Sequence, residues 1–206
     1  MKTLNIVIPM KGLSQSKQRL RHVLNVQQRE TLSLTLFRNT LTFFAEHYPQ
    51  YNLLVVTDNA NIERIAMRLE ACVYRETQCD GLNAALTKAT QWSEQHGFTH
   101  QLIVPADIGK LNKQELDQVI ATGLQQAEVV IATAKDLGTN ALMTSPPSAI
   151  PFAYGLQSSA KHAQLAHQAN RRLEVLSLND LSQDIDNPSD ILDWYQQSPI
   201  TEYCYE

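Results

Sequence analysis

The fold is decided by one stretch of sequence, Leu102-Ile103-Val104-Pro105-Ala106-Asp107. Its apolar run is typical of a strand buried on both faces, and a proline and a lone carboxylate close the stretch. In open α/β sheets, ligands bind just beyond the carboxyl ends of the strands. Asp107 is therefore expected where a carboxylate can hold a metal ion against a phosphate.

Strand-like and helix-like segments alternate on both sides of this stretch. Short apolar runs predict strands, and apolar residues at helical spacing predict the helices between them. Such alternation predicts an α/β fold with a mostly parallel sheet and helices on both faces. The expected strands are Leu4–Pro9, Leu53–Asp58, Cys72–Tyr74, Leu102–Asp107, Glu128–Thr133, an edge strand at Phe152–Gly155, and Leu173–Leu178; the expected helices follow Ser14, run over Val26–His47, Ile62–Leu69, Gly81–His96 and Leu111–Leu124, follow Ser158, and close the chain through Trp194.

Length and composition predict one domain, residues 1–206, that is long enough to bury a sizeable core. The 43% hydrophobic and 18% charged residues are ordinary for a globular enzyme and unlike a disordered chain. A formal net charge of −4 gives nucleic-acid binding no electrostatic support, and no apolar run is long enough to span a membrane. An odd count of 3 cysteines without a signal-peptide pattern predicts a cytoplasmic protein with reduced thiols.

Three cations crowd the turn that follows the first expected strand: Lys11, Lys17 and Arg19. With Ser14 as an N-cap, this would be a strand-to-helix turn, which offers free backbone N–H groups and the positive end of a helix dipole. The turn therefore predicts a site for the phosphates of a nucleotide. A solvated basic face is the alternative interpretation. The glycine patterns of a dinucleotide site and of a P-loop are both absent.

Asp184 and Asp186 are the carboxylates that matter most after Asp107. Residues two apart in an extended segment point to the same side, about 7 Å apart, so both could face one cation or a pair of cations. Alternatively, Asp186 is a turn residue and Asp190 only supports the first turn of the closing helix. Magnesium prefers one or two protein carboxylates together with phosphate oxygens and water. The three aspartates and the cationic turn therefore predict metal-assisted chemistry on phosphates.

Gly81 and Asn83 begin another expected helix. The glycine permits a close backbone approach, and the asparagine has donors and acceptors that could contact a base or a ribose. A plain helix start with Asp80 as its N-cap explains the same residues.

Several short motifs follow one another along roughly residues 4–192. Each motif alone is weakly diagnostic, whereas Gly-Thr-Asn-Ala-Leu joined to a late Asp-x-Asp-x-Pro is quite specific. The motifs are Ile8-Pro9-Met10-Lys11-Gly12-Leu13, Ser16-Lys17-Gln18-Arg19-Leu20, Gly81-Leu82-Asn83-Ala84-Ala85-Leu86, Pro105-Ala106-Asp107, Gly138-Thr139-Asn140-Ala141-Leu142, the Phe152–His162 segment, and Asp184-Ile185-Asp186-Asn187-Pro188-Ser189-Asp190.

In kind and order, these motifs resemble the 2-phospho-L-lactate guanylyltransferase (CofC/FbiD) family of the MobA-like nucleotidyltransferase superfamily. The resemblance implies a Rossmann-like fold of the nucleotide-diphospho-sugar transferase type. It implies GTP as co-substrate and Mg²⁺ as metal. It also implies that the acceptor is a small phosphorylated hydroxy or enol acid, namely 2-phospho-L-lactate, phosphoenolpyruvate or 3-phospho-D-glycerate. Pyrophosphate would be released, and the product would lie on the route to a deazaflavin coenzyme.

The resemblance also gives expected roles to individual residues and leaves three questions open. A related nucleotidyltransferase acting on a sugar phosphate or on molybdopterin is one alternative, and a non-catalytic nucleotide-binding protein is another. A homodimer is left open as well. The implied residues are Asp107, Asp184 and Asp186 for the metal; Lys11, Lys17 and Arg19 for the triphosphate; Gly81 and Asn83 for the nucleoside; and Thr139, Gly155 and Ser158 for the acceptor.

Overall fold

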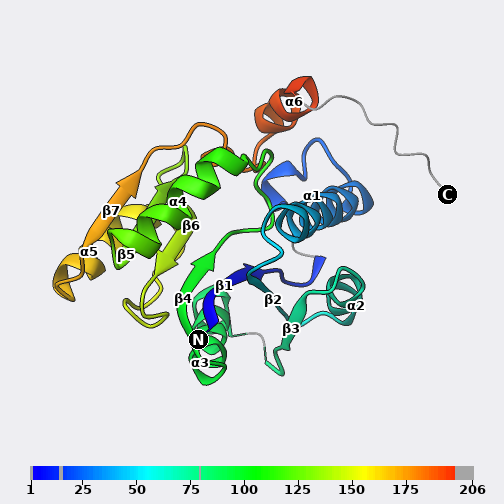
Figure 1. Cartoon of the computed structure of the whole chain (residues 1–206). Coiled ribbons are helices and arrows are strands. Elements are labelled where there is room, and N and C mark those ends of the chain that lie inside the picture. Colours follow the sequence, from blue (N-terminus) through cyan, green and yellow to red (C-terminus); the bar gives the residue numbers. More distant parts are fainter. Residues whose placement is uncertain (1, 14–15, 79, 198–206) are drawn as a thin grey trace.

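One seven-stranded sheet forms the centre of the computed structural model, which describes residues 2–13, 16–78 and 80–197 (Figure 1). The strand order is β3-β2-β1-β4-β6-β5-β7. The neighbouring pairs are parallel except those of β6, which runs antiparallel to both β4 and β5. The mostly parallel sheet is therefore confirmed. The strands are β1 (Lys2–Pro9), β2 (Asn52–Thr57), β3 (Cys72–Arg75), β4 (Phe98–Ile103), β5 (Val129–Thr133), β6 (Thr139–Thr144) and β7 (Leu173–Leu176).

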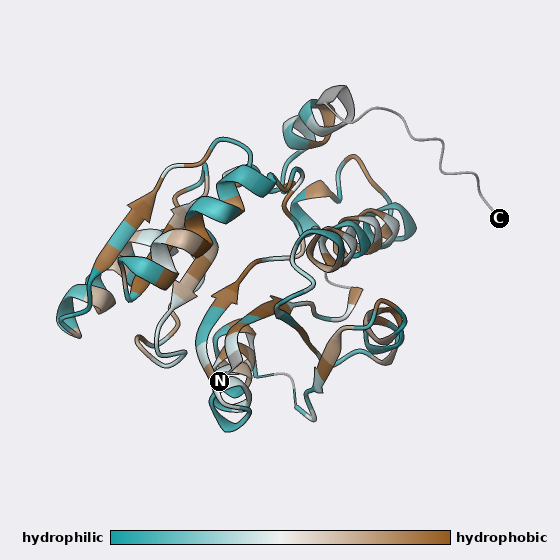
Figure 2. Ribbon diagram, in the orientation of Figure 1, coloured by the Kyte–Doolittle hydropathy of each residue, from teal (hydrophilic) through white to brown (hydrophobic). Residues whose placement is uncertain are grey.

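Helices cover both faces of the sheet because side chains alternate along each central strand. In β1, Leu4, Ile6 and Ile8 join the core beneath α1, α2 and α4, whereas Val7 joins the core beneath α3 and α5. Figure 2 shows the apolar strands between helices whose outer sides are hydrophilic. The helices are α1 (Val26–His47), α2 (Ala60–Arg68), α3 (Leu82–Gln95), α4 (Lys113–Gln125), α5 (Ser158–Gln168) and α6 (Pro188–Gln197).

A buried polar network fixes the register of the central strands beneath α3. Asn5 of β1 donates to Ser93 Oγ at 2.7 Å, and Ser93 donates to Gln101 Oε1 of β4 at 2.7 Å. Gln101 in turn donates to Thr90 at 2.8 Å, and Asn52 of β2 donates to Asn5 Oδ1 at 2.7 Å. Buried polar side chains are costly without partners, so a shift of any of these strands would leave unpaired amides in the core.

Strand β6 is the element that the sequence did not predict. Polar Thr139 and Asn140 hide its strand pattern, although all six of its residues are buried. Asn140 is tolerated there because its side chain donates to the carbonyl oxygen of Leu181 at 3.0 Å.

The edge strand expected at Phe152–Gly155 is wrong. No strand is assigned to this segment. Two backbone N–H groups of this segment donate to side chains rather than to a neighbouring strand: Ala153 N–H donates to His162 Nε2 at 3.0 Å, and Tyr154 N–H donates to Asn83 Oδ1 at 2.9 Å.

The helix expected after Ser14 is also wrong. Only a short 3₁₀ turn, η2 (Gln18–Leu20), forms there, and Lys17 just before it has φ 50°, in the left-handed region. A right-handed helix cannot pass through that conformation. Ser14 lies outside the described residues, as do Cys79 and residues 198–206.

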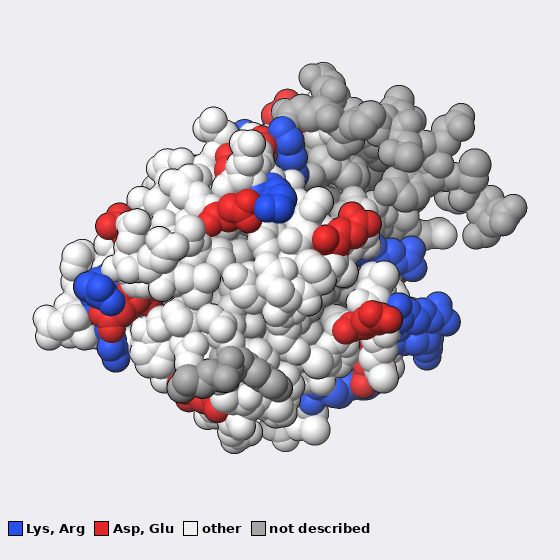
Figure 3. Space-filling model, viewed as in Figure 1, with Lys and Arg blue, Asp and Glu red and all other residues white. Residues whose placement is uncertain are grey.

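The described surface carries charges of both signs. Acidic and basic side chains are interspersed on the face shown in Figure 3. Within the described ranges, we find no helix that is both long and apolar enough to cross a bilayer.

Helix α1 begins at the predicted residue because its N-terminus is capped by side chains. Gln28 N–H donates to Asn25 Oδ1 at 2.9 Å, and Asn25 N–H donates to Gln28 Oε1 at 2.9 Å. This reciprocal pair is a capping box, which satisfies two backbone donors that no helical carbonyl can reach.

Replacing the capping residue should destabilise the whole protein, because α1 packs against the core. We expect Asn25→Ala to lower the free energy of unfolding by about 1 kcal/mol, measured by urea denaturation. Gln27→Ala is the matched control, since Gln27 is exposed on the same helical turn and has no capping role. Equal losses in the two variants would contradict the role of the cap.

Candidate active site

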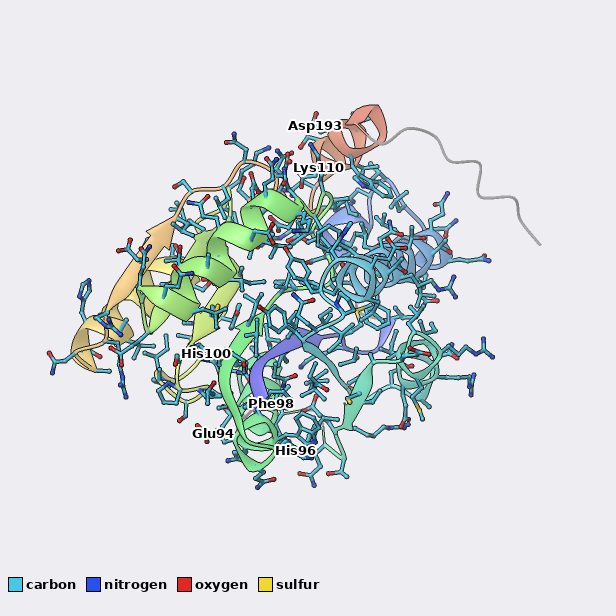
Figure 4. The ribbon with its side chains drawn as sticks, in the orientation of Figure 1. Glu94, His96, Phe98, His100, Lys110 and Asp193 are labelled. Carbon is cyan, nitrogen blue, oxygen red and sulfur yellow. The ribbon has the colours of Figure 1, made fainter. Side chains whose placement is uncertain are left out.

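A cleft with a volume of about 330 Å³ opens at the carboxyl ends of β1 and β4. The chain leaves β1 toward β2 and β3 on one side and returns to β4 on the other, so the two strands flank a topological switch point. Lys11 and Lys17 line the cleft from the segment after β1, and Asp107 lines it from the segment after β4. Figure 4 shows Lys110 and Asp193 at this end of the molecule, whereas Glu94, His96, Phe98 and His100 lie at the opposite end.

Lys17 joins two of the predicted carboxylates. Its Nζ lies 2.7 Å from Asp107 Oδ2 and 3.0 Å from Asp186 Oδ1, and the lysine side chain is only 5% exposed. Arg19 adds a second cation, 3.2 Å from Asp186 Oδ2, on the exposed side. Burial by itself lowers the pKa of Lys17, but attraction to Asp107 and Asp186 outweighs it and holds that pKa above its usual value. The ammonium therefore stays charged.

The late aspartates reach Asp107 because two distant loops are hydrogen-bonded to each other. Ile185 N–H donates to the Asp107 carbonyl at 3.0 Å, and Gly109 N–H donates to the Gln183 carbonyl at 2.9 Å. A Cβ on Gly109 would lie 3.0 Å from the side chain of Ile185, so a small residue suits this close approach. The predicted meeting of Asp107 with the late aspartates thus rests on backbone contacts across about 75 residues of chain.

Asp190 takes the structural role that we had left open. Its Oδ2 accepts from Asp186 N–H at 3.0 Å and from Asn187 N–H at 2.7 Å, at the start of α6. A carboxylate there satisfies free amide groups and suits the helix dipole. Asp190 therefore orients the backbone of Asp186.

The three predicted metal carboxylates lie in one another's electrostatic field. Burial, then repulsion by Asp107 and Asp186, raises the pKa of Asp184 to about 6. Within the described ranges, however, no three His, Cys, Asp or Glu side chains are grouped closely enough to form a metal site by themselves. The ammonium of Lys17 lies between two of the carboxylates instead. Hard oxygen donors around a cation position suit Mg²⁺, which binds one or two carboxylates and completes its shell with phosphate and water.

A second polar group lies behind the cleft and includes two of the residues expected to contact the acceptor. Ser158 Oγ donates to Thr139 Oγ1 at 3.1 Å, and His162 Nδ1 lies 3.0 Å from the same oxygen. His162 Nε2 accepts from the backbone of Ala153, so the proton of the neutral ring is on Nδ1, which donates to Thr139. Burial, and to a lesser extent Lys161, lowers the pKa of His162 to about 4 and keeps the ring neutral. Gly155, with φ 126°, makes the turn before Ser158 that other residues rarely adopt.

The predicted nucleoside residues lie at the start of α3, but the side chain of Asn83 bonds to the protein. Gly81, rather than Asp80, is the N-cap, with φ 98°. Asn83 Oδ1 accepts from Tyr154 N–H at 2.9 Å, and Asn83 Nδ2 donates to the Tyr154 carbonyl at 3.3 Å. A direct nucleoside contact from Asn83 stays a prediction.

Two residues of the cleft were missed in the sequence. Ser33 of α1 and Tyr154 both line the cleft, and each has a buried hydroxyl oxygen without a hydrogen-bond partner among the described residues. Ser33 belongs to no motif, and Tyr154 lies in the Phe152–His162 segment without a role assigned to it, because packing alone shows that both residues reach the cleft.

The fold recurs in solved structures of nucleotidyltransferases. One match is a structure from Desulfovibrio desulfuricans G20 that is described as a nucleotide-diphospho-sugar transferase. Its TM-score is 0.71 at 17% identity, and the match covers 98% of this chain and 90% of the other. The 4-diphosphocytidyl-2C-methyl-D-erythritol synthase of Anaerococcus prevotii matches with a TM-score of 0.65 at 10% identity, covering 96% and 97%. The chain therefore shares the fold of the nucleotidyltransferases.

Sequence comparison places the chain within that class. The model of the family "Guanylyl transferase CofC like" matches residues 4–197. A 3-phospho-D-glycerate guanylyltransferase from Colwellia psychrerythraea is 42% identical over 96% of this chain and 94% of its own length. A phosphoenolpyruvate guanylyltransferase from Roseiflexus sp. is 29% identical over 95% and 86%. The chain belongs to the CofC-like guanylyl transferase family.

The buried neutral His162 should make the protein less stable in acid. Between its ordinary value of 6.5 and its folded value of about 4, the unfolded chain binds a proton that the folded chain does not. The stability contributed by neutral His162 is therefore complete above pH 6.5 and is lost as the pH falls toward 4, by roughly 3 kcal/mol at most.

The measurement is chemical denaturation of the wild type and of His162→Gln between pH 7 and pH 4. We expect the variant to be less stable at pH 7, with a difference that shrinks as the pH falls. Other titrating groups, Asp184 included, cancel in this difference. A difference that is independent of pH would contradict the neutral, buried state of the ring.

Proposed function

We propose that this protein transfers GMP from GTP to the phosphate of a small phosphorylated carboxylic acid and releases pyrophosphate. The observation that carries the proposal is the Lys17 bridge between Asp107 and Asp186 at the carboxyl ends of the central strands. A cation held between carboxylates in that place suits the handling of a triphosphate. Family membership supports GTP as donor, and the motifs support a place in deazaflavin coenzyme biosynthesis.

The chemistry needs charge neutralisation more than proton transfer. An oxygen of the acceptor phosphate attacks the α-phosphorus of GTP, the bond from that phosphorus to the bridging oxygen breaks, and its electron pair leaves with pyrophosphate. A phosphate dianion is already nucleophilic at neutral pH, so no general base is required. Lys11, Lys17 and Arg19 are the cations of this proposal: they reduce the repulsion between two anions and hold the triphosphate in line.

Mg²⁺ is part of the proposal, with Asp107, Asp184 and Asp186 as the residues that would hold it. When bound, it would neutralise charge that develops on the phosphate oxygens. With Mg²⁺ bound, Asp107 and Asp186 would keep a cationic partner, so Lys17 would be able to pair with the phosphates without leaving these carboxylates uncompensated. The raised pKa of Asp184, which comes first from burial and then from repulsion by Asp107 and Asp186, is consistent with this assignment, because a nearby cation would offset both effects.

For the acceptor, we favour 3-phospho-D-glycerate over phosphoenolpyruvate. The 3-phospho-D-glycerate enzyme of Colwellia is 42% identical to this chain, against 29% for the phosphoenolpyruvate enzyme of Roseiflexus. Thr139, Gly155 and Ser158 are the proposed acceptor residues. Thr139 Oγ1 already accepts from Ser158 and from His162, so its own proton is free to point toward an anion.

The proposal is tested by a substrate matrix. GTP, ATP, CTP and UTP are each combined with 2-phospho-L-lactate, phosphoenolpyruvate and 3-phospho-D-glycerate, with and without Mg²⁺, and pyrophosphate release is measured. We expect release with GTP and Mg²⁺, fastest with 3-phospho-D-glycerate. Release from CTP in place of GTP, or tight GTP binding without any release, would contradict the proposal.

Removing the charge of Asp107 should stop turnover without unfolding the protein. We expect Asp107→Asn to lower kcat by about 10²- to 10³-fold with Mg²⁺ present, because a charge next to the reacting phosphates is lost. Asp117→Asn is the matched control, since Asp117 pairs with Lys113 at 2.6 Å, outside the cleft lining. A near-normal kcat in Asp107→Asn would contradict the proposed role of Asp107 in binding the metal.

Lys17→Ala should impair the use of GTP more than it lowers the stability of the fold. Asp107 and Asp186 are 38% and 31% exposed, so water can solvate them when the ammonium is removed. We expect kcat/KM for GTP to fall by about 10²-fold or more, whereas the melting temperature should change little. Lys113→Ala removes an exposed ion pair as the control. If Lys17→Ala left both kcat and the KM for GTP unchanged, Lys17 would not belong to the site.

A further inference from the structure

Tyr154 lines the cleft. Its hydroxyl oxygen is buried and has no hydrogen-bond partner among the residues that the structure describes. The hydroxyl of Tyr48 behaves differently: Tyr48 Oη donates to Asp117 at 2.9 Å and lies 3.1 Å from the Lys113 carbonyl oxygen. Leaving a buried hydroxyl unpaired costs free energy, and a phenylalanine ring would fill the same space without that cost.

The position of Tyr154 is fixed by its surroundings. Both backbone polar groups of Tyr154 bond to the side chain of Asn83. Its ring packs edge-on against His162, with the ring centroids 4.8 Å apart and the planes at 70°. His162 is itself held by Thr139 and by the backbone of Ala153. The phenol is therefore pre-organised, and a ligand that bonds to it would not have to order a mobile side chain.

The surroundings also indicate which ligand the phenol faces. Tyr154 immediately precedes Gly155, and its ring rests on the network that contains Thr139 and Ser158. These are the residues of the proposed acceptor site, whereas Lys11 and Lys17 line the cleft from the segment after β1. Burial raises the pKa of Tyr154, so the phenol keeps its proton and can donate.

We propose that Tyr154 is an acceptor-recognition residue, whose hydroxyl donates a hydrogen bond to an oxygen of the bound phosphorylated acid. The inference rests on the proposed function and adds a residue that fixes the acceptor in the cleft. Asn83 acts through Tyr154 as a positioning residue, because its amide holds the tyrosine backbone at the start of α3.

The experiment compares Tyr154→Phe with Tyr48→Phe, because each variant removes one hydroxyl and keeps its ring. We expect Tyr154→Phe to raise the KM for the best acceptor by roughly 10- to 100-fold, as expected for loss of a hydrogen bond to a charged group, with the KM for GTP unchanged. Its melting temperature should stay the same or rise. Tyr48→Phe should lower the melting temperature and leave both KM values unchanged.

The three acceptors refine the result. An equal loss for 3-phospho-D-glycerate and phosphoenolpyruvate supports a contact to the phosphate or carboxylate that both contain. A loss confined to 3-phospho-D-glycerate supports a contact to its hydroxyl. An unchanged KM for every acceptor, or a raised KM for GTP alone, overturns the inference.

Direct binding separates this inference from the proposed function. Calorimetric titration of 3-phospho-D-glycerate with Mg²⁺ into the wild type and into Tyr154→Phe needs no turnover. Binding by the wild type that weakens in the variant supports the role of Tyr154 even if no pyrophosphate is released, in which case only the transfer reaction fails. Absence of binding to the wild type, or equal binding to both proteins, overturns the role of Tyr154.

Discussion

The buried ammonium of Lys17 needs anionic partners, and this need joins three segments that are far apart in the sequence. A charge that is withdrawn from water is tolerated only when it is paired and hydrogen-bonded. Asp107 comes from the end of β4, Asp186 from the loop before α6, and Lys17 from the segment after β1. Lys17 has a left-handed backbone just before the short turn η2, and it lines the cleft. Removing one partner would leave the others with an unbalanced charge in a partly buried place.

Lys17 forms ion pairs with Asp107 and Asp186, and a phosphate substrate can take the place of these carboxylates as partner of the lysine. In the folded chain, the ammonium of Lys17 balances two carboxylates. In the proposed reaction, Asp107 and Asp186 would hold Mg²⁺ and Lys17 would neutralise charge on the triphosphate, so that each charge stays compensated in a partly buried site. The incomplete metal cluster among the described residues agrees with this account, because Mg²⁺ takes many of its ligands from phosphate and water.

The polar group behind the cleft is organised by hydrogen-bond direction rather than by charge. A backbone N–H fixes the tautomer of His162, and His162 and Ser158 both donate to Thr139. The cleft therefore has cationic side chains suited to a triphosphate, and Tyr154 connects it to a neutral group of oriented hydrogen bonds behind it.

The local sequence pattern predicted most of the elements of the fold, because the hydrophobic periodicity of consecutive residues distinguishes buried strands from amphipathic helices. Helix α1 has the predicted bounds Val26–His47, since apolar spacing and a local cap determine both. The failures share one cause. Strand β6, the segment Phe152–Gly155 and the turn at Lys17 take their conformations from partners elsewhere in the chain: Leu181, Asn83 with His162, and the two aspartates. No window of sequence contains both members of such pairs.

The sequence by itself determined the class of sheet and the family. Its motifs also indicated the candidate charged groups: lysines after the first strand, Asp107 after the central one, and aspartates before the last helix. Tertiary structure decided which of these groups meet. It placed Lys17 between Asp107 and Asp186, bound the Asn83 side chain to the backbone of Tyr154, and left the Tyr154 hydroxyl without a partner among the described residues. The physical reason is that the identity of a side chain determines the chemistry it can perform. Burial and long-range backbone contacts determine which polar groups lose their water and therefore must pair with each other.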